Sequence, residues 1–180
     1  MSRIMPVTRT EPNATAAVRA ALREVGAPLL ATQQGRRKKP LSLEELIAEA
    51  LRSSHRDASL ARVLPLVLWQ HLESLDLATL VRLARARKEL HTLGFFLDLT
   101  AELSRNRALR REARSLRDRR RKRPRLFFVH SEPGKFTLQL VEKNTPAIAR
   151  YWQFLLNMPL DSFSSLFEKF KDRHAPLSTH

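Results

Sequence analysis

The segment from Arg105 to Arg125 concentrates the positive charge of this chain. It holds twelve Lys and Arg residues against two acidic residues, a net charge of +10 in a chain whose total is +15. Guanidinium groups are always charged and donate paired hydrogen bonds to phosphate and carboxylate oxygens. Because a concentrated patch of like charge repels itself, we expect this segment to bind an anionic partner. A smaller cluster, Arg36 to Lys39, is expected to be a solvated linker.

Apolar residues inside the segment predict that it forms a helix and packs against the rest of the protein. Leu109, Ala113 and Leu116 follow one another at intervals of four and three residues, which places them in one narrow stripe of a helix. The spacing predicts a helix that extends at least to Arg121, ends before Pro124 and docks its stripe on the rest of the protein. The candidate binding residues on and just beyond this helix are Arg107, Arg110, Arg111, Arg114, Arg117, Arg121, Lys122 and Arg123.

A row of arginines on a rigid helix can follow the phosphates of a nucleic acid, and this is the function that we favour. Few Asn or Gln residues accompany the arginines, so we expect contacts with the backbone rather than readout of the bases. Two alternatives use the same residues. The helix would dock on an acidic protein surface, as in an antitoxin-like or scaffold protein, or it would be a solvated face that keeps the chain soluble.

Periodic apolar residues predict four helices ahead of the basic segment. Ser42 and Glu45 have the spacing of a capping box and begin the first helix. Asp57 and Asp76 supply N-caps for the second and third, and a stripe of apolar residues over 90–101 defines the fourth. Short links between them indicate a mainly α fold, a compact helical array.

The pattern changes after the basic segment. A short apolar run over 126–129 and alternating apolar residues over 136–140 flank a Ser-Glu-Pro-Gly turn, which predicts a β-hairpin near residues 126–141. Two C-terminal helices follow, one beginning at Thr145 and Pro146 and one capped by Asp161. The large aromatic residues that we expect to be anchors in the core or at an interface are Trp69, Tyr151 and Trp152.

These elements predict a single helical domain over residues 41–172. Residues 1–40 are expected to be a flexible basic tail, although Ala17 to Val25 show one short helical pattern that prolines bracket. Residues 173–180 are expected to fray.

Several classes of function lack the residues that they need. The chain has no Cys and only 4 Gly, which excludes disulfides, thiolate metal sites and Gly-rich phosphate loops. No apolar run is long enough to span a bilayer, so we expect a soluble protein of the cytoplasm. The 6 His are scattered and expected at the surface or in the hairpin, and Asp98 and Glu102 on a solvated helix face. We therefore expect no enzymatic activity, no metal and no cofactor.

A helical stretch from Leu75 to Leu103 carries a family resemblance. It opens with Leu-Asp, continues through an Ala- and Arg-rich turn and reaches LGFFLDLT, where Leu93, Gly94, Phe95 and Leu97 match a Leu-Gly-Phe-x-Leu tendency. The stretch resembles the C-terminal helical region of abortive-infection antitoxins of type IV toxin-antitoxin systems. The resemblance implies a nucleotidyltransferase toxin as partner, and in that family a winged-helix DNA-binding domain precedes this region. It covers about a sixth of the chain and carries over no functional residue.

Overall fold

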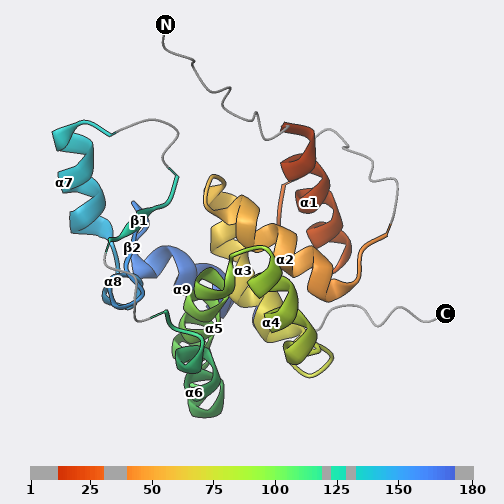
Figure 1. Ribbon diagram of the computed structural model, residues 1–180. Coiled ribbons are helices and arrows are strands. Elements are labelled where there is room, and N and C mark those ends of the chain that lie inside the picture. Colours follow the sequence, from red (N-terminus) through yellow and green to blue (C-terminus); the bar gives the residue numbers. More distant parts are fainter. Residues whose placement is uncertain (1–11, 31–39, 119–122, 129–132, 173–180) are drawn as a thin grey trace, which may run out of the picture.

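The structure is a computed structural model that describes residues 12–30, 40–118, 123–128 and 133–172. Within these residues the fold is mainly helical, which confirms the predicted class (Figure 1). Two short strands are β1 (Arg125–Leu126) and β2 (Phe154–Leu155). The helices are α1 (Pro12–Glu24), α2 (Leu43–Ser54), α3 (Ala58–Gln70), α4 (Leu77–Ala86), α5 (Leu90–Ser104), α6 (Arg107–Ser115), α7 (Lys135–Asn144), α8 (Ala147–Tyr151) and α9 (Leu160–Phe170).

Capping side chains begin the helices where the sequence predicts them. Ser42 Oγ accepts a hydrogen bond from the Glu45 N–H at 3.2 Å, and Glu45 Oε2 accepts one from the Ser42 N–H at 3.0 Å, so the capping box opens α2. Asp57 and Asp76 accept N–H groups from the first turns of α3 and α4. These bonds satisfy donors that the first turn of a helix otherwise leaves unpaired.

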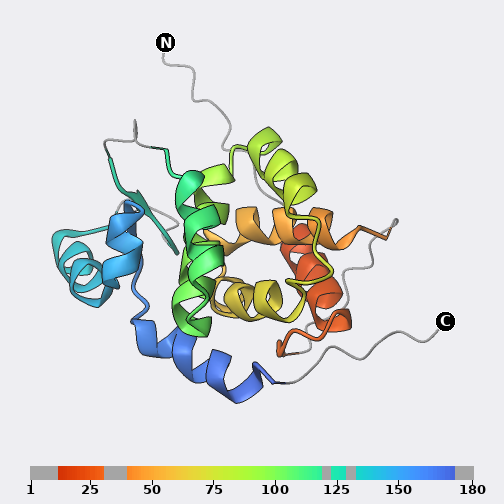
Figure 2. The ribbon, with the colours of Figure 1, turned by 90° about the horizontal axis from the view of Figure 1, so that it is seen from below.

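Helices α3 and α5 form the centre of the core. Every residue of α5 from His91 to Ala101 is buried, and α3 is buried from Val63 to Leu68. A helix that is buried all round must be covered on every side. Helix α5 contacts α3, α4, α6 and α8, while α3 also contacts α2 and α9 (Figure 2). No helix in the described ranges is both long enough and apolar enough to cross a membrane.

The prediction of a flexible tail over residues 1–40 is wrong for residues 12–30. Helix α1 packs against α2, and its Val18 and Leu22 are buried in the core. Arg19 adds an ion pair with Asp57 at 3.4 Å. The helix tolerates Pro12 because a proline at the first helical position has no intrahelical N–H bond to lose. The predictions for residues 1–11, 31–39 (the Arg36 to Lys39 cluster included) and 173–180 lie outside the described residues.

The predicted β-hairpin near residues 126–141 is also wrong. The expected second strand is part of α7, and β1 pairs in parallel with the distant β2, with Arg125 opposite Phe154 and Leu126 opposite Leu155. Phe154 is fully buried, whereas Phe136 of α7 is 80% exposed. The strand that pairs with β1 is therefore the one whose Phe154 is buried in the core. It is not the segment that follows β1 most closely in the sequence.

The helix predicted from Thr145 and Pro146 forms as the short helix α8. It ends at Tyr151 because Gln153 adopts a left-handed conformation with a φ of 55°, after which the chain continues into β2. The last predicted helix forms as α9 and buries Phe163 and Phe167, with Asp161 in its first turn rather than at its cap.

Gly94 lets α5 approach the segment that follows α8. Trp152 is fully buried, which confirms its prediction as a core anchor. A Cβ atom added at Gly94 would lie 2.6 Å from Cζ3 of the Trp152 indole and 3.2 Å from the carbonyl oxygen of Ala113 in α6. The indole and the backbone of α6 therefore occupy the space that any larger residue would need.

We expect Gly94→Ala to lower the free energy of unfolding by about 1–3 kcal/mol, because the added methyl group forces the indole or α6 to move. Urea denaturation followed by circular dichroism measures the change. Gly134→Ala is the matched control, since a Cβ there meets nothing within 4 Å, and it should change stability by less than about 1 kcal/mol. Equal midpoints for Gly94→Ala and the wild type would contradict this packing.

Candidate nucleic-acid interface

The arginine-rich helix docks as predicted but is shorter than predicted. Leu109 and Ala113 of α6 are buried and face α5, and Asn106 Oδ1 caps the helix by accepting the Leu109 N–H at 3.0 Å. The helix ends at Ser115 rather than near Arg121. The next two N–H groups bond to carbonyl oxygens three residues back, and the Asp118 N–H donates to His91 Nδ1 at 3.2 Å. These bonds replace the α-helical pattern and end the helix.

A buried carboxylate on α5 binds two arginines of α6. Asp98 has a side chain with 0% exposure. Its Oδ2 accepts hydrogen bonds from Arg114 Nε at 3.3 Å and from Trp152 Nε1 at 2.9 Å, and its Oδ1 lies 3.6 Å from Arg110 Nε. The expectation of a solvated face is therefore wrong for Asp98. A buried charge is costly unless it is paired, so these contacts hold α6 in one orientation.

Two of the candidate arginines lie over an aromatic ring. The guanidinium carbon of Arg117 is 4.1 Å from the centroid of Tyr151, and that of Arg114 is 5.0 Å away. Both distances are within the range of a cation–π interaction. Tyr151, which was expected to be an anchor, remains 38% exposed. Arg110, Arg114 and Arg117 thus all have partners inside the protein.

Arg107 and Arg111 are the candidate residues of α6 that point to solvent without an ion-pair partner among the described residues. They lie on the opposite side of the helix from Leu109 and Ala113, as a rotation of 100° per residue requires. Arg123 is exposed just before β1. The remaining candidates, Arg121 and Lys122, lie outside the described residues.

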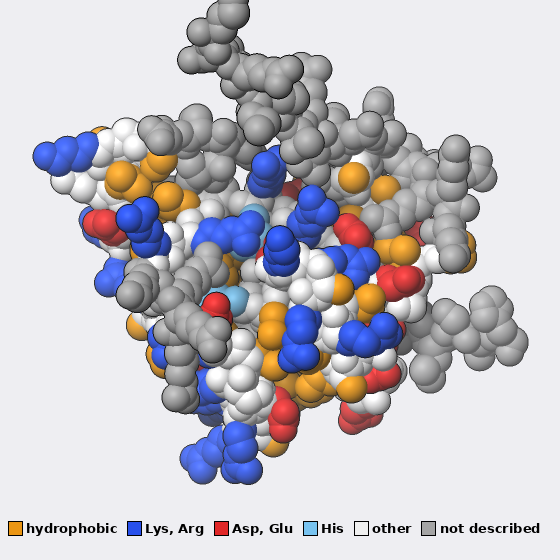
Figure 3. All heavy atoms as spheres, viewed as in Figure 1, with side chains coloured by type: hydrophobic (Ala, Val, Ile, Leu, Met, Phe, Trp, Pro, Cys, Tyr) orange, Lys and Arg blue, Asp and Glu red, His pale blue; other side chains and the backbone are white. Residues whose placement is uncertain are grey.

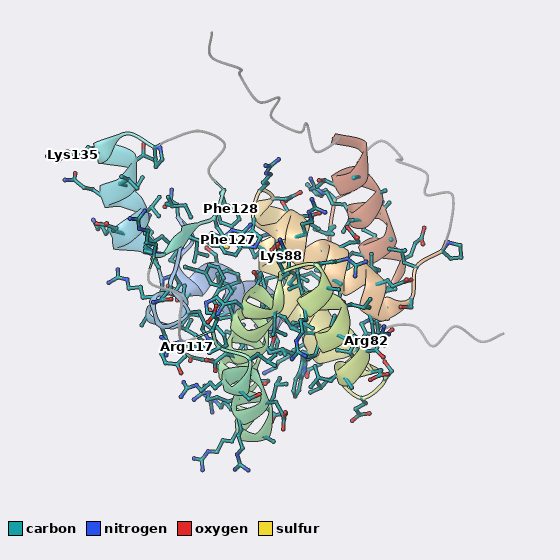
Figure 4. All side chains as sticks on the ribbon, in the orientation of Figure 1. Arg82, Lys88, Arg117, Phe127, Phe128 and Lys135 are labelled. Atoms are coloured by element: carbon teal, nitrogen blue, oxygen red, sulfur yellow. The ribbon has the colours of Figure 1, made fainter. Side chains whose placement is uncertain are left out.

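Further cations that sequence reasoning missed lie on α4 and in the turn after it. Arg82, Arg85 and Lys88 are exposed. Figure 3 shows Lys and Arg side chains spread over the face that it draws, with hydrophobic and acidic side chains between them, and Figure 4 labels Arg82, Lys88 and Arg117 in the same view. In the sequence these cations read as the polar side of an ordinary amphipathic helix. The spacing of three residues between Arg82 and Arg85, which places both on one side of α4, was the available signal.

A buried polar cluster attaches β1 to the helical core. His55 Nε2 lies 2.9 Å from Glu89 Oε2, and Thr92 Oγ1 donates to the same oxygen at 2.7 Å. Arg125 Nη1 is 3.7 Å from that oxygen, and the His55 carbonyl oxygen accepts the Phe128 N–H at 2.7 Å. The start of α5 therefore holds the charge of Arg125, and the junction of α2 and α3 holds the backbone after β1.

The expectation that the histidines lie at the surface is wrong for His55 and His91, which are both buried. His91 Nε2 is 2.6 Å from the carbonyl oxygen of Trp152, in addition to its contact with the Asp118 N–H. His130, like the two C-terminal histidines, lies outside the described residues. Across the described part of the chain, no group of three or more His, Asp or Glu side chains is arranged to hold a metal ion.

The electrostatics of the cluster keep Glu89 charged. Burial acts to raise the pKa of this carboxyl group, but the hydrogen bond and charge of His55, the Thr92 hydroxyl and the charge of Arg125 together outweigh it. The pKa of Glu89 therefore lies below its ordinary value of 4.5.

No protein-family model matches this chain, and no curated protein or solved structure matches it either. Charge and geometry are therefore what define the candidate interface.

We expect Asp98→Asn to lower the free energy of unfolding by about 1–3 kcal/mol. The amide keeps the size of the side chain and an oxygen for the Trp152 indole N–H, but it removes the charge that pairs with Arg110 and Arg114. Chemical denaturation tests this against Glu102→Gln, because Glu102 is 41% exposed and its pair with Arg110 should contribute less than about 1 kcal/mol. Similar decreases in the free energy of unfolding in the two variants would show that the buried Asp98 contributes no more to stability than the exposed Glu102.

The lowered pKa of Glu89 predicts a pH dependence. A carboxyl group whose pKa is lower in the folded state stabilises the fold above the unfolded-state pKa, and that contribution is lost as the pH falls through the folded-state pKa. We therefore expect the free energy of unfolding to decline below about pH 4.5 and to decline less steeply in Glu89→Gln. Chemical denaturation at several pH values measures how the free energy of unfolding depends on pH in the wild type and in Glu89→Gln. Glu112→Gln, a change at an exposed residue of α6, should keep the wild-type slope.

Proposed function

We propose that this protein binds nucleic acid through phosphate contacts made by the exposed arginines of α6 and the neighbouring cations, without enzymatic activity. The observation that carries the proposal is the pair Arg107 and Arg111. Both guanidinium groups are exposed on a docked helix and have no ion-pair partner among the described residues. A chain of net charge +15 that leaves such groups unpaired has a strong electrostatic preference for a polyanion.

The packing of α6 supports this proposal because it presents the two side chains from fixed positions. Arg107 and Arg111 are four residues apart, or about 6 Å along the helix axis. Leu109, Ala113 and the Asp98 pairs prevent the helix from rotating. A preorganised donor loses less conformational freedom on binding than one on a mobile segment.

An acidic protein is the second candidate partner, and one feature of α7 favours it. Phe136 is 80% exposed and Leu140 is 40% exposed, one helical turn apart, with Lys135 and Lys143 nearby. Exposed apolar residues near lysines would fit an apolar pocket with an acidic rim. The resemblance to antitoxins would make a nucleotidyltransferase toxin such a partner.

We expect the double change Arg107→Glu and Arg111→Glu to weaken binding to nucleic acid by at least about 10-fold, since each lost phosphate contact also reduces counterion release. Fluorescence anisotropy with labelled oligonucleotides across a salt series measures the affinity. The slope of log affinity against log salt should become shallower by about 2.

The control carries the same change of net charge on other elements, Arg23→Glu and Arg62→Glu, at exposed residues of α1 and α3. It should retain most of the affinity, and circular dichroism should show both variants folded. An equal loss of affinity in the control variant would mean that binding depends on the net charge of the protein and not on the exposed face of α6. Wild-type binding that is indifferent to salt, or no binding at all, would refute the phosphate model.

A further inference from the structure

Two aromatic side chains are exposed at one end of the molecule. Among the described residues Phe136 of α7 is 80% exposed and Tyr151 at the end of α8 is 38% exposed, whereas Trp152, Phe127 and Phe154 are fully buried. Figures 1 and 2 both place α7 and α8 together at this end, opposite α1. Exposing a large aromatic ring to water is unfavourable, so these two rings are candidates for contact with a ligand.

Hydrogen bonds join the end of α7 to α8 and to the residue that follows β2. The Arg150 guanidinium donates to the Glu142 carbonyl oxygen in the last turn of α7. Thr145 Oγ1 donates to the Val141 carbonyl oxygen at 2.6 Å and accepts the Leu156 N–H at 3.0 Å. Phe136 precedes Glu142 by six residues, so its ring projects about 9 Å further along the helix from this joint.

Cations accompany both rings. Arg114 and Arg117 lie over Tyr151, and Arg150 is its neighbour in α8. Phe136 follows Lys135 directly in α7. Exposed aromatic rings beside arginines and lysines are the arrangement with which proteins bind single strands, because the rings stack on bases while the cations contact the backbone. The bases of a duplex are already stacked on one another and cannot use such rings.

We propose that this end of the molecule binds single-stranded nucleic acid, with bases stacking on Phe136 and against the Tyr151–Arg117 pair, and with phosphates contacted by the exposed cations beside them, Lys135 and Arg150. This inference rests on the proposed function and specifies its substrate class. Because Arg117 lies over the Tyr151 ring, a base at this point would stack on the guanidinium plane that the ring supports, since bases stack on guanidinium planes as well as on aromatic rings. A strand that crosses from α6 over Tyr151 to α7 would use the arginines and the rings together.

The experiment compares single-stranded and duplex probes at one salt concentration. Fluorescence anisotropy is measured with labelled oligothymidylate and oligouridylate of about 20 nucleotides, a length that exceeds one binding site, and with a duplex of equal length. We expect the wild type to prefer the single strands. Phe136→Ala and Tyr151→Ala should each lower single-strand affinity by about 10-fold and leave duplex affinity within about 2-fold.

Two controls separate stacking from other effects. Tyr151→Phe keeps the ring and should keep the affinity. Leu140→Ala removes an exposed apolar side chain of the same helix without removing a ring, and it should leave single-strand binding unchanged. All four variants alter exposed positions, and circular dichroism should confirm that each is folded.

The outcomes distinguish this inference from the proposed function. Equal affinity for single strands and duplex, or unchanged binding in the alanine variants, would overturn the stacking inference and leave phosphate binding intact. A loss in Leu140→Ala as large as that in Phe136→Ala would also overturn it, because α7 would then act as an apolar docking face of the kind that an acidic protein would use. No binding to any probe would overturn both proposals.

Discussion

The Asp98 carboxylate has no access to solvent, and the arrangement of α6 and of the segment after α8 depends on its need for partners. It takes hydrogen bonds from Arg114 and from the Trp152 indole and lies beside Arg110. Gly94, one turn earlier on the same helix, leaves the space that the indole fills. An ionised group in the interior is tolerated only when such contacts are satisfied. Asp98 therefore joins α5, the centre of the core, to the two parts of the chain that carry the candidate binding surface.

This constraint divides the arginines of the basic segment by role. Arg110 and Arg114 neutralise the buried carboxylate, and Arg114 and Arg117 contact Tyr151. Arg107 and Arg111 face solvent on the side of α6 that lies opposite Leu109 and Ala113. A run that looks uniform in composition thus contains side chains that position the helix and side chains that are available to a ligand. Because the first group holds the second in place, the surface is preorganised for an anionic partner.

A second polar centre, around His55 and Glu89, attaches the short strands. A parallel pair of two-residue strands is too small to be stable by itself. Here β1 is held by the contact of Arg125 with Glu89 and by the Phe128 N–H bond to His55, while the rings of Phe127 and Phe154 pack with centroids 5.1 Å apart. These contacts make the C-terminal part of the chain continuous with the helical core. They also place β1 and its cations on the same body as α6.

The sequence by itself determined the mainly α class, the capped starts of α2, α3 and α4 and the docked stripe of Leu109 and Ala113. Each of these depends on residues within one or two helical turns, where spacing alone fixes which side chains meet. It also located the candidate surface, although among the described residues only Arg107, Arg111 and Arg123 of the candidates are exposed without an ion pair or a ring contact inside the protein. The tertiary structure decided which arginines Asp98 would bind, that His55 and His91 would be buried, and that β1 would pair with β2 while residues 135–144 became a helix. Those outcomes depend on partners far away in the chain, and burial changes the cost of a polar or charged group in a way that local spacing does not encode.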